Sequence, residues 1–374
     1  MRKLFYSLIC MVFVCSSLTA SAFSPDFEKT EVKKVMKNVA DWQIANFSKV
    51  PYSPGNWVNA IMYIGMFDWG KLAFEQDKNE SYLKFLSKIG NRTGWQPEKR
   101  MYHADDICVS QMYIDLYRFY GKKNPTMINP TIARTDWVMA HPSQNSMDLN
   151  YRDGRTLERW TWCDALFMAP PVYARLYNMT GDKEYIRFMN QQYKDCYDHL
   201  FDKEEHLFFR DANYIERKEP NGEKMFWARG NGWVLGGLCQ ILDELPAKDK
   251  NRKFYEELFK ELCGTVVKLQ QPDGYWRASL LDAESYPSPE TSGTAFYVYA
   301  FAYGINHGLL SKEEYMPALQ KGWKALVDAV DPDGRLGYVQ PIGEAPKKVT
   351  REMTELYGPG AFLMAGCEIY KMSK

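Results

Sequence analysis

The chain has 374 residues, and its 47 basic and 47 acidic side chains give a formal net charge of zero. This balance excludes the strongly basic surface that nucleic-acid or anionic-membrane partners require. Aromatic residues make up 15% of the chain, which suits a large core or a cleft that stacks aromatic rings on sugars, and composition leaves both open.

The N-terminal segment has the pattern of a signal peptide. Basic residues precede a short apolar stretch, 4–18, and the sequence Ala20-Ser21-Ala22 fits a cleavage site. The apolar stretch is too short for a membrane span, and no later segment resembles one. We therefore expect cleavage after residues 1–22 and an exported, periplasmic or secreted protein without membrane association. Lipidation at Cys15 is the less favoured alternative.

Helical periodicity dominates residues 23–374, which we expect to form a single domain. Start and stop signals predict about twelve helices, near 26–46, 57–76, 79–91, 104–120, 125–140, 162–179, 182–199, 230–244, 250–270, 291–307, 312–330 and 358–371. Every second helix, starting with 57–76, is apolar on most faces, whereas the others carry one apolar stripe. Buried helices that alternate with half-exposed ones predict an all-α fold, an (α/α)6 barrel of two concentric rings.

The cysteines after residue 22 do not form a recognisable pattern. They are widely spaced and lack a C-x-x-C motif, at Cys108, Cys163, Cys196, Cys239, Cys263 and Cys367. This spacing is more typical of cysteines that serve as small apolar residues in helix interiors than of a zinc site or a disulfide scaffold. The sequence does not decide whether one disulfide forms. Histidine is scarce and phosphate- or dinucleotide-binding motifs are missing, so we expect no metal and no cofactor.

The inner helices of such a barrel begin at one mouth, which makes their first residues candidates for a functional site. Aromatic, acidic and basic side chains of the kinds that bind or cleave sugars gather at these starts: Trp57, His103, Asp105, Asp106, Trp162, Asp164, Trp227, Arg229 and Trp233.

Asp164 lies in the apolar run 160–171, between aromatic residues. As a helix cap, its carboxylate would gain a backbone N–H and a favourable dipole, which lower the pKa. Burial beside Trp160, Trp162 and Phe167 would raise the pKa towards the value that a general acid needs. The residues alone leave both roles open.

Two further motifs allow a structural or a functional reading. Asp105 and Asp106 suit an N-cap and a first-turn acid, which explains one carboxylate and leaves the other as a candidate. Arg229 and Trp233 stand four residues apart, a spacing that places them on one helical face. Arginine suits a carboxylate and tryptophan suits a sugar ring, but a glycine-rich turn with a packed Trp233 fits equally well.

These motifs together resemble the unsaturated rhamnogalacturonyl and glucuronyl hydrolases of glycoside hydrolase family 105, related to family 88. The resemblance runs in order along the chain after residue 22. It is carried by His103-Ala104-Asp105-Asp106, Trp162-Cys163-Asp164-Ala165-Leu166-Phe167-Met168, Phe226-Trp227-Ala228-Arg229-Gly230-Asn231-Gly232-Trp233, Ser292-Gly293-Thr294-Ala295 and Tyr357-Gly358-Pro359-Gly360-Ala361-Phe362. Members of that family have an (α/α)6 barrel.

The resemblance implies a reaction. The substrate is an oligosaccharide whose non-reducing end carries a 4,5-unsaturated uronic acid left by a polysaccharide lyase. An aspartic acid protonates C4, water activated by the same carboxylate adds at C5, and the hemiketal opens to release the neighbouring sugar. By motif match Asp164 is the acid/base, and the second aspartate is Asp105 or Asp106, with Asp106 preferred. Arg229 and Trp233 match binding residues, and we expect Trp162 nearby.

The chain departs from the family in the segment before Arg229. Some members carry a histidine there, whereas this sequence has Leu207-Phe208-Phe209-Arg210-Asp211, preceded by His206. We hypothesise that Arg210 takes over carboxylate recognition. Galacturonyl substrates from rhamnogalacturonan and glucuronyl substrates from ulvan or arabinogalactan both remain open.

Two alternatives also remain. The chain could be another (α/α)6 carbohydrate enzyme, an inverting glycosidase or a uronate lyase. It could instead bind glycans without catalysis. We expect a monomer whose partner is the oligosaccharide.

Overall fold

The computed structural model describes residues 27–373, so the predicted signal peptide lies outside the described residues. These residues form α-helices α1 (Lys29–Asn46), α2 (Trp57–Asp77), α3 (Ser81–Thr93), α4 (Ala104–Ile107), α5 (Ser110–Phe119), α6 (Asn129–Ala140), α7 (Ala165–Met168), α8 (Pro170–Thr180), α9 (Lys183–Leu200), α10 (Ala228–Glu244), α11 (Arg252–Val266), α12 (Thr291–Asn306), α13 (Lys312–Asp328) and α14 (Tyr357–Met372). A two-stranded antiparallel hairpin pairs β1 (Phe201–Asp202) with β2 (Leu207–Phe208).

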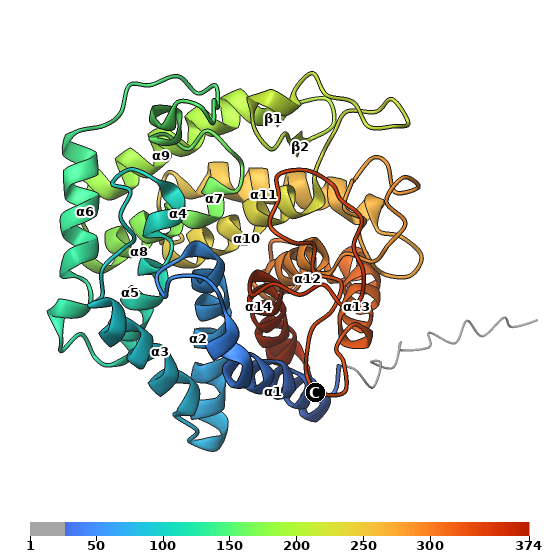
Figure 1. Ribbon diagram of the computed structural model, residues 1–374, viewed down its shortest axis with the longest axis horizontal. Helices are drawn as coiled ribbons and strands as arrows, with labels where there is room; N and C mark the ends of the chain where they lie inside the picture. Colours follow the sequence, from blue (N-terminus) through green and yellow to red (C-terminus); the bar gives the residue numbers. More distant parts are fainter. Residues whose placement is uncertain (1–26, 374) are drawn as a thin grey trace, which may run out of the picture.

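The helices form two rings. The inner ring closes through successive contacts of α2 with α5, α5 with α8, α8 with α10, α10 with α12, α12 with α14, and α14 with α2. In the outer ring, α3, α9, α11 and α13 each pack on inner helices, α6 packs on α9, and α1 packs on α14 and α2. Figure 1 shows the chain passing once round the molecule, from blue α1 through green α9 to red α14, which returns beside α1. The predicted (α/α)6 barrel is confirmed.

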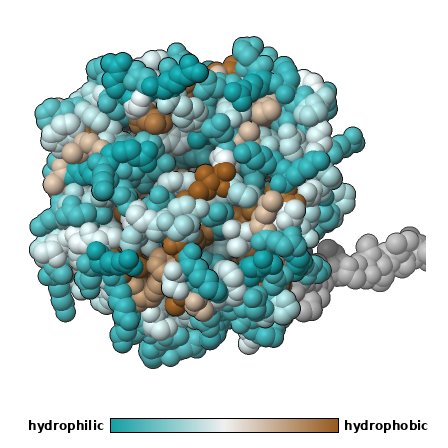
Figure 2. Space-filling view, viewed as in Figure 1, coloured by the Kyte–Doolittle hydropathy of each residue, from teal (hydrophilic) through white to brown (hydrophobic). Residues whose placement is uncertain are grey.

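Burial along the helices follows the predicted alternation. In α12, residues 291–304 are all buried, as expected for a helix surrounded by others. In α11, the buried residues form one stripe that includes Tyr255, Leu258 and Leu262. The face of the molecule seen in Figure 2 is mainly hydrophilic, with hydrophobic side chains near its centre.

Glycines allow the inner helices to approach closely. A Cβ atom added to Gly65 of α2 would lie 2.1 Å from the carbonyl oxygen of Gly360 in α14. A Cβ atom added to Gly237 of α10 would lie 2.2 Å from the carbonyl oxygen of Leu166 in α7. Both distances are far below van der Waals contact, so a side chain at either position would push two inner helices apart.

The structure differs from the predicted elements in two inner helices and one loop. The predicted helix 104–120 divides into α4 and α5, and 162–179 divides into α7 and α8. Pro170 lacks an N–H and cannot continue α7, and the side-chain amide of Gln111 instead donates to the carbonyl oxygens of Phe167 (2.9 Å) and Met168 (3.2 Å). The β1–β2 hairpin is too short to produce an alternating sequence pattern.

All six described cysteines are buried and free, which confirms their role as small interior residues. Within residues 27–373, no helix combines the length and the apolar character that a membrane crossing requires.

Candidate active site

The candidate site lies where the inner helices begin. Trp57 is the first residue of α2, His103 directly precedes α4, Asp164 directly precedes α7, and Arg229 lies in the first turn of α10. The barrel therefore places these residues, which are far apart in the sequence, at the same end of the inner ring.

Pairing with a neighbouring segment fixes the backbone around Asp164. Trp162 forms an antiparallel bridge with Asp211, and the Cys163 N–H donates to the carbonyl oxygen of Arg210 at 2.8 Å. These contacts carry the side chain of Arg210 to Asp164, so that Nε of Arg210 lies 3.5 Å from Oδ2 of Asp164. The Arg210–Asp211 segment thus positions a cation beside the candidate acid.

The Asp164 carboxyl group is not used as a helix cap. Asp164 precedes α7 with a helical backbone, and its side chain accepts no capping hydrogen bond. The residue is only 7% exposed, and the Cys163 thiol donates a hydrogen bond to Oδ2 of its carboxyl group at 3.5 Å. The sequence alone left open whether Asp164 caps a helix or acts as a general acid. In the structure, Asp164 is a buried acid without a capping role.

Burial dominates the ionisation of Asp164. Desolvation raises the pKa of Asp164 above its usual value, while the charges of Arg210 and Arg229 lower the pKa by a smaller amount. The net direction is upward. A raised pKa keeps the carboxyl group protonated at higher pH, as a proton donor requires.

Asp105 and Asp106 have different environments. Asp106 is held by Arg100, whose Nε donates to Oδ1 at 3.0 Å and whose backbone N–H donates to Oδ2 at 2.7 Å. The Asp105 carboxyl group accepts no hydrogen bond from an arginine within residues 27–373. Burial raises the pKa of Asp105 to about 7, the charge of Arg100 opposes this shift, and the charge of Asp164 adds to it. The geometry reverses the preference for Asp106: Asp105 is the carboxylate that interacts with Asp164, and Asp106 anchors the loop before α4.

His103 caps α4 and stays neutral. Its Nδ1 accepts a hydrogen bond from the Asp105 N–H at 3.2 Å, and its ring lies 5.0 Å from that of Trp162. Burial, together with the nearby charge of Arg100, lowers the pKa of His103 to about 4. His103 therefore orients the backbone of Asp105 and contributes no positive charge near neutral pH.

Arg210 connects Asp164 with the rim of the site. Its Nη1 donates to Oδ2 of Asp211 at 2.7 Å and also contacts the hydroxyl of Tyr151. The Tyr151 hydroxyl in turn donates to Oε2 of Glu344 at 2.6 Å. The Nε of Arg210 is buried and makes no hydrogen bond within residues 27–373. A chain of polar contacts thus runs from the candidate acid to two surface loops.

Arg229 is a buried cation without a carboxylate partner among the described residues. It is 1% exposed, and its guanidinium lies between the rings of Trp227 (4.4 Å) and Tyr357 (4.6 Å). Nη1 donates to the carbonyl oxygen of Gln340 at 2.6 Å and Nη2 to that of Pro341 at 2.9 Å. A buried positive charge bound only to neutral groups is suited to an anionic ligand.

Most of the candidate tryptophans are packing residues in this structure. Trp162, Trp227 and Trp233 are 3%, 2% and 1% exposed, so they do not present an open face for sugar stacking. Trp233 packs on Phe296, with ring centroids 4.6 Å apart. Trp57 is half-buried and is the candidate tryptophan with accessible ring surface.

Several residues of the site were not singled out from the sequence. Tyr151 and Glu344 lie in long irregular segments, where no periodicity marks them. Tyr357 and Asp211 were within quoted motifs, but only the structure shows that they contact Arg229 and Arg210. His206 lies elsewhere, with Nδ1 2.6 Å from Oε1 of Glu261.

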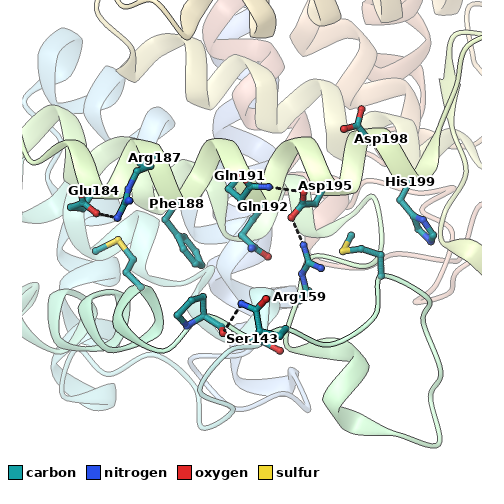
Figure 3. Close-up of a pocket in the computed structure, with 14 residues that line it drawn as sticks. Ser143, Arg159, Glu184, Arg187, Phe188, Gln191, Gln192, Asp195, Asp198 and His199 are labelled. Carbon is teal, nitrogen blue, oxygen red and sulfur yellow. Dashed lines mark hydrogen bonds and ion pairs between the residues drawn. The ribbon is translucent and has the colours of Figure 1, made fainter.

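A separate groove of about 740 Å³ lies outside the barrel, between α6, α9 and the segment 142–147. Figure 3 shows two ion pairs among its lining residues: Arg187 pairs with Glu184, and Arg159 pairs with Asp195. None of the inner-helix starts lines this groove. It is therefore distinct from the candidate active site.

Comparisons with known proteins agree with this site. Residues 20–373 match the sequence profile of Glycosyl Hydrolase Family 88. The chain is 38% identical over 377 residues to an unsaturated 3S-rhamnoglycuronyl hydrolase of Formosa agariphila, covering 98% of both chains. It is 33% identical over 366 residues to an enzyme of the same name from Alteromonas sp., covering 92% of this chain and 87% of that one.

Solved structures share the fold of this chain. A family 88 glycosyl hydrolase from Bacteroides vulgatus superposes with a TM-score of 0.81 at 30% identity, covering 92% of this chain and 99% of that one. A protein named as a polysaccharide lyase superposes with a TM-score of 0.81 at 32% identity, covering 92% of this chain and 98% of the other. The expected relation to family 88 is confirmed, and the chain is a glycoside hydrolase that belongs to glycosyl hydrolase family 88.

Proposed function

We propose that this enzyme removes a 4,5-unsaturated uronic acid from the non-reducing end of an oligosaccharide by hydrating the C4–C5 double bond. The observation that carries the proposal is Asp164, a buried carboxyl group with a raised pKa and no capping role, at the end of the barrel where the inner helices begin. Both relatives named above are unsaturated 3S-rhamnoglycuronyl hydrolases.

Asp164 acts as acid and then as base in this proposal. Its carboxyl group donates a proton to C4, and the positive charge that develops at C5 is shared with the ring oxygen. The resulting carboxylate removes a proton from water, whose oxygen bonds to C5. The hemiketal formed at C5 then opens, and the neighbouring sugar leaves. One carboxyl group suffices, because no displacement at C1 by a second carboxylate is required.

The neighbouring residues supply charge and orientation. Arg229 is suited to the carboxylate of the unsaturated uronic acid, because it is buried, positively charged and free of any carboxylate partner in residues 27–373. The negative charge of Asp164 raises the pKa of Asp105, which shows that the two carboxyl groups interact. Arg210 lowers the pKa of Asp164 and orients its carboxyl group.

We further propose an unsaturated uronyl–rhamnose unit as the substrate, as the names of the two relatives imply. This choice favours glucuronyl substrates of the ulvan type over rhamnogalacturonan-derived ones.

Export to the periplasm or the exterior fits the predicted signal peptide. A monomer would leave the mouth of the barrel open.

The test is loss of the ultraviolet absorbance of the ene-carboxylate when the purified enzyme meets unsaturated disaccharides prepared with lyases from ulvan, pectin, arabinogalactan and glycosaminoglycans. The proposal predicts that the absorbance falls fastest with the disaccharide prepared from ulvan. Stable absorbance with every disaccharide would reject it.

The pair of Asp105 and Asp164 would also suit an inverting glycosidase, which uses two carboxylates. That enzyme would act on saturated glycosides. A uronate lyase would increase the absorbance of a saturated polysaccharide, and a binding protein would leave all absorbances unchanged. The same assay, run with saturated and unsaturated substrates, separates these outcomes.

A further inference from the structure

The groove between α6, α9 and the segment 142–147 has the dimensions of a ligand site. Its volume of about 740 Å³ is typical of pockets that bind small molecules. Its lining residues on α9 lie between Glu184 and His199 at helical spacing, which places them on one face of that helix. They span roughly 22 Å along the helix axis, by the rise per residue of an α-helix. The groove therefore suits an extended ligand.

Gln192 lines this groove without a partner from the protein. The residue is 7% exposed, and its side-chain amide makes no hydrogen bond to another residue within 27–373. Figure 3 shows Phe188 and Gln192 pointing from α9 towards the segment that contains Ser143. A buried amide without a partner costs folding free energy, and an apolar side chain of similar size would avoid that cost. Packing alone therefore does not account for an amide at this position, whereas a ligand in the groove would supply its missing partners.

The same face of α9 supplies an aromatic surface at Phe188. Phe188 is half-buried, and its ring centroid lies 5.0 Å from that of Tyr173 and 6.2 Å from that of Trp160. These contacts hold the ring from the inner side. Met139 and Met147 extend the apolar surface of the groove. Aromatic and aliphatic surface of this kind packs on the C–H faces of sugar rings.

Hydrogen bonds fix the opposite wall. The Ser143 hydroxyl donates to Oε2 of Glu158 at 2.8 Å, and the Asn145 side chain donates to the same oxygen at 2.7 Å. Asn145 also donates to the carbonyl oxygen of Arg155 at 3.1 Å. A groove whose wall is fixed in the free protein loses little entropy when it binds a ligand.

The charges of the groove favour a neutral ligand over an anion. Arg187 pairs with Glu184, and Arg159 pairs with Asp195. Asp198 also lines the groove and makes no ion pair within residues 27–373. Both arginines are thus engaged, and the unpaired charge is negative. Sugar hydroxyls, which both donate and accept, match the amides and paired charges of this wall, whereas carboxylates and sulfates are repelled.

We propose that this groove is a second carbohydrate-binding site, which holds neutral sugar residues of a glycan chain. Phe188 contacts a sugar ring, and the amide of Gln192 exchanges hydrogen bonds with its hydroxyls. The proposal goes beyond the proposed function, because Asp164 and the reacting carbons take no part in it. A glycan bound here keeps the enzyme on carbohydrate between turnovers.

The experiment is titration calorimetry of the wild type with saturated neutral oligosaccharides of rhamnose, xylose, galactose and glucose, and with oligogalacturonate of the same length. None of these probes carries the unsaturated uronic acid that the reaction at Asp164 requires. We expect at least one neutral probe to bind, and to bind more tightly than oligogalacturonate. Lack of binding by every neutral probe, or tighter binding of oligogalacturonate, would overturn the proposal.

Two variants of the groove test the assignment of residues. Gln192→Met removes the amide and Phe188→Leu removes the aromatic face, and each should weaken binding of the neutral probe about fivefold. Because the Gln192 amide has no partner in the protein, Gln192→Met should keep or raise the melting temperature. A lower melting temperature would show a structural role for the amide and overturn its assignment, as would wild-type affinity in both variants.

Phe254→Leu is the matched control for Phe188→Leu. Phe254 of α11 is also half-buried and also packs on two aromatic rings, those of Tyr193 (6.1 Å) and Tyr197 (5.4 Å). It does not line the groove, so Phe254→Leu should bind the neutral probe like the wild type. An equal loss of affinity in Phe254→Leu would show that general destabilisation causes the effect and would overturn the contact with Phe188.

Failure of the second site is distinguishable from failure of the proposed function. Gln192→Met and Phe188→Leu should turn over an unsaturated disaccharide with the kcat/KM of the wild type. Asp164→Asn should bind the neutral probe like the wild type, whatever the outcome of the absorbance assay. Loss of this binding in Asp164→Asn would place the probe in the barrel and overturn the second site.

Discussion

The Nε atom of Arg210 lies 3.5 Å from Oδ2 of Asp164, while Nη1 of the same guanidinium donates to Oδ2 of Asp211 at 2.7 Å. Asp211 therefore holds Arg210 near the candidate acid without allowing a short ion pair to form. A close pair would keep Asp164 ionised. At the observed distance the arginine lowers the pKa of Asp164 but does not cancel the larger effect of burial.

Replacement of Arg210 should change the pH dependence of catalysis. Arg210→Met removes a positive charge that lowers the pKa of Asp164, so the pKa rises further and the alkaline limb of the kcat/KM profile moves to higher pH. Arg210→Lys retains the charge and should keep the limb close to that of the wild type. An unmoved limb in Arg210→Met would refute this electrostatic role, and an unchanged KM would refute carboxylate recognition by Arg210.

Asp105→Asn should lower activity and stabilise the protein at alkaline pH. The pKa of Asp105 is about 7 in the folded protein, against 3.8 for the free group. The folded state therefore binds the proton more tightly, and stability is lost as pH rises from about 3.8 to about 7.

Asparagine cannot ionise, so Asp105→Asn removes this loss of folding stability at alkaline pH, which is at most on the order of 4 kcal/mol. Thermal unfolding at pH 8 should give a higher melting temperature for Asp105→Asn than for wild type, with the difference vanishing near pH 3. Activity should fall roughly 100-fold.

Asp106→Asn serves as the contrast, because it breaks the contacts with Arg100 and should destabilise the protein. Equal stability of Asp105→Asn and wild type at pH 8 would contradict the assignment.

Arg229→Lys should reduce kcat/KM by roughly 100-fold or more, because lysine keeps the charge but not the planar group. The guanidinium both stacks between Trp227 and Tyr357 and donates to two backbone carbonyl oxygens. Steady-state kinetics with an unsaturated disaccharide, together with circular dichroism as a folding control, measures the effect. Full activity in Arg229→Lys would show that a positive charge alone is sufficient.

The two neighbouring tryptophans Trp57 and Trp233 should respond differently to replacement. Trp233 is 1% exposed and packs among aromatic rings, so Trp233→Ala should lower the free energy of unfolding by about 3–5 kcal/mol. Trp57 is half-buried and stacks on Tyr357, with ring centroids 5.7 Å apart. Trp57→Ala should cost less stability and raise KM several-fold. Urea unfolding and kinetics on both variants make the comparison, and a larger stability loss in Trp57→Ala would contradict it.

The sequence was sufficient to predict the barrel because helical periodicity is strong in long elements. It predicted α12 nearly to the residue. It did not predict the division between α7 and α8, although Pro170 and Pro171 lie at that point, because prolines are also tolerated in the first turn of a helix. The β1–β2 hairpin, with two residues in each strand, is too short for a period to be visible.

The candidate site was predictable in part. Residues at inner-helix starts, such as Asp164 and Arg229, follow from the barrel itself. The choice between Asp105 and Asp106 does not, since it depends on where Arg100 reaches. Tyr151 and Glu344 approach each other across 193 positions of sequence, and contacts between irregular loops leave no local signal. Trp233 was expected to bind sugar because sequence does not reveal which face of an inner helix remains accessible.

The most direct test of the proposed role of Asp164 is Asp164→Asn. Asparagine has nearly the same shape but cannot donate a proton to carbon, so turnover of the unsaturated disaccharide should fall by roughly 1,000-fold or more. Binding should persist, because Asp164 is not a cap and removing its charge also removes a desolvation cost. Titration calorimetry with the unsaturated disaccharide should give an affinity within about threefold of the wild-type KM, provided that KM approximates the dissociation constant. Turnover at the wild-type rate in Asp164→Asn would contradict its assignment as the proton donor.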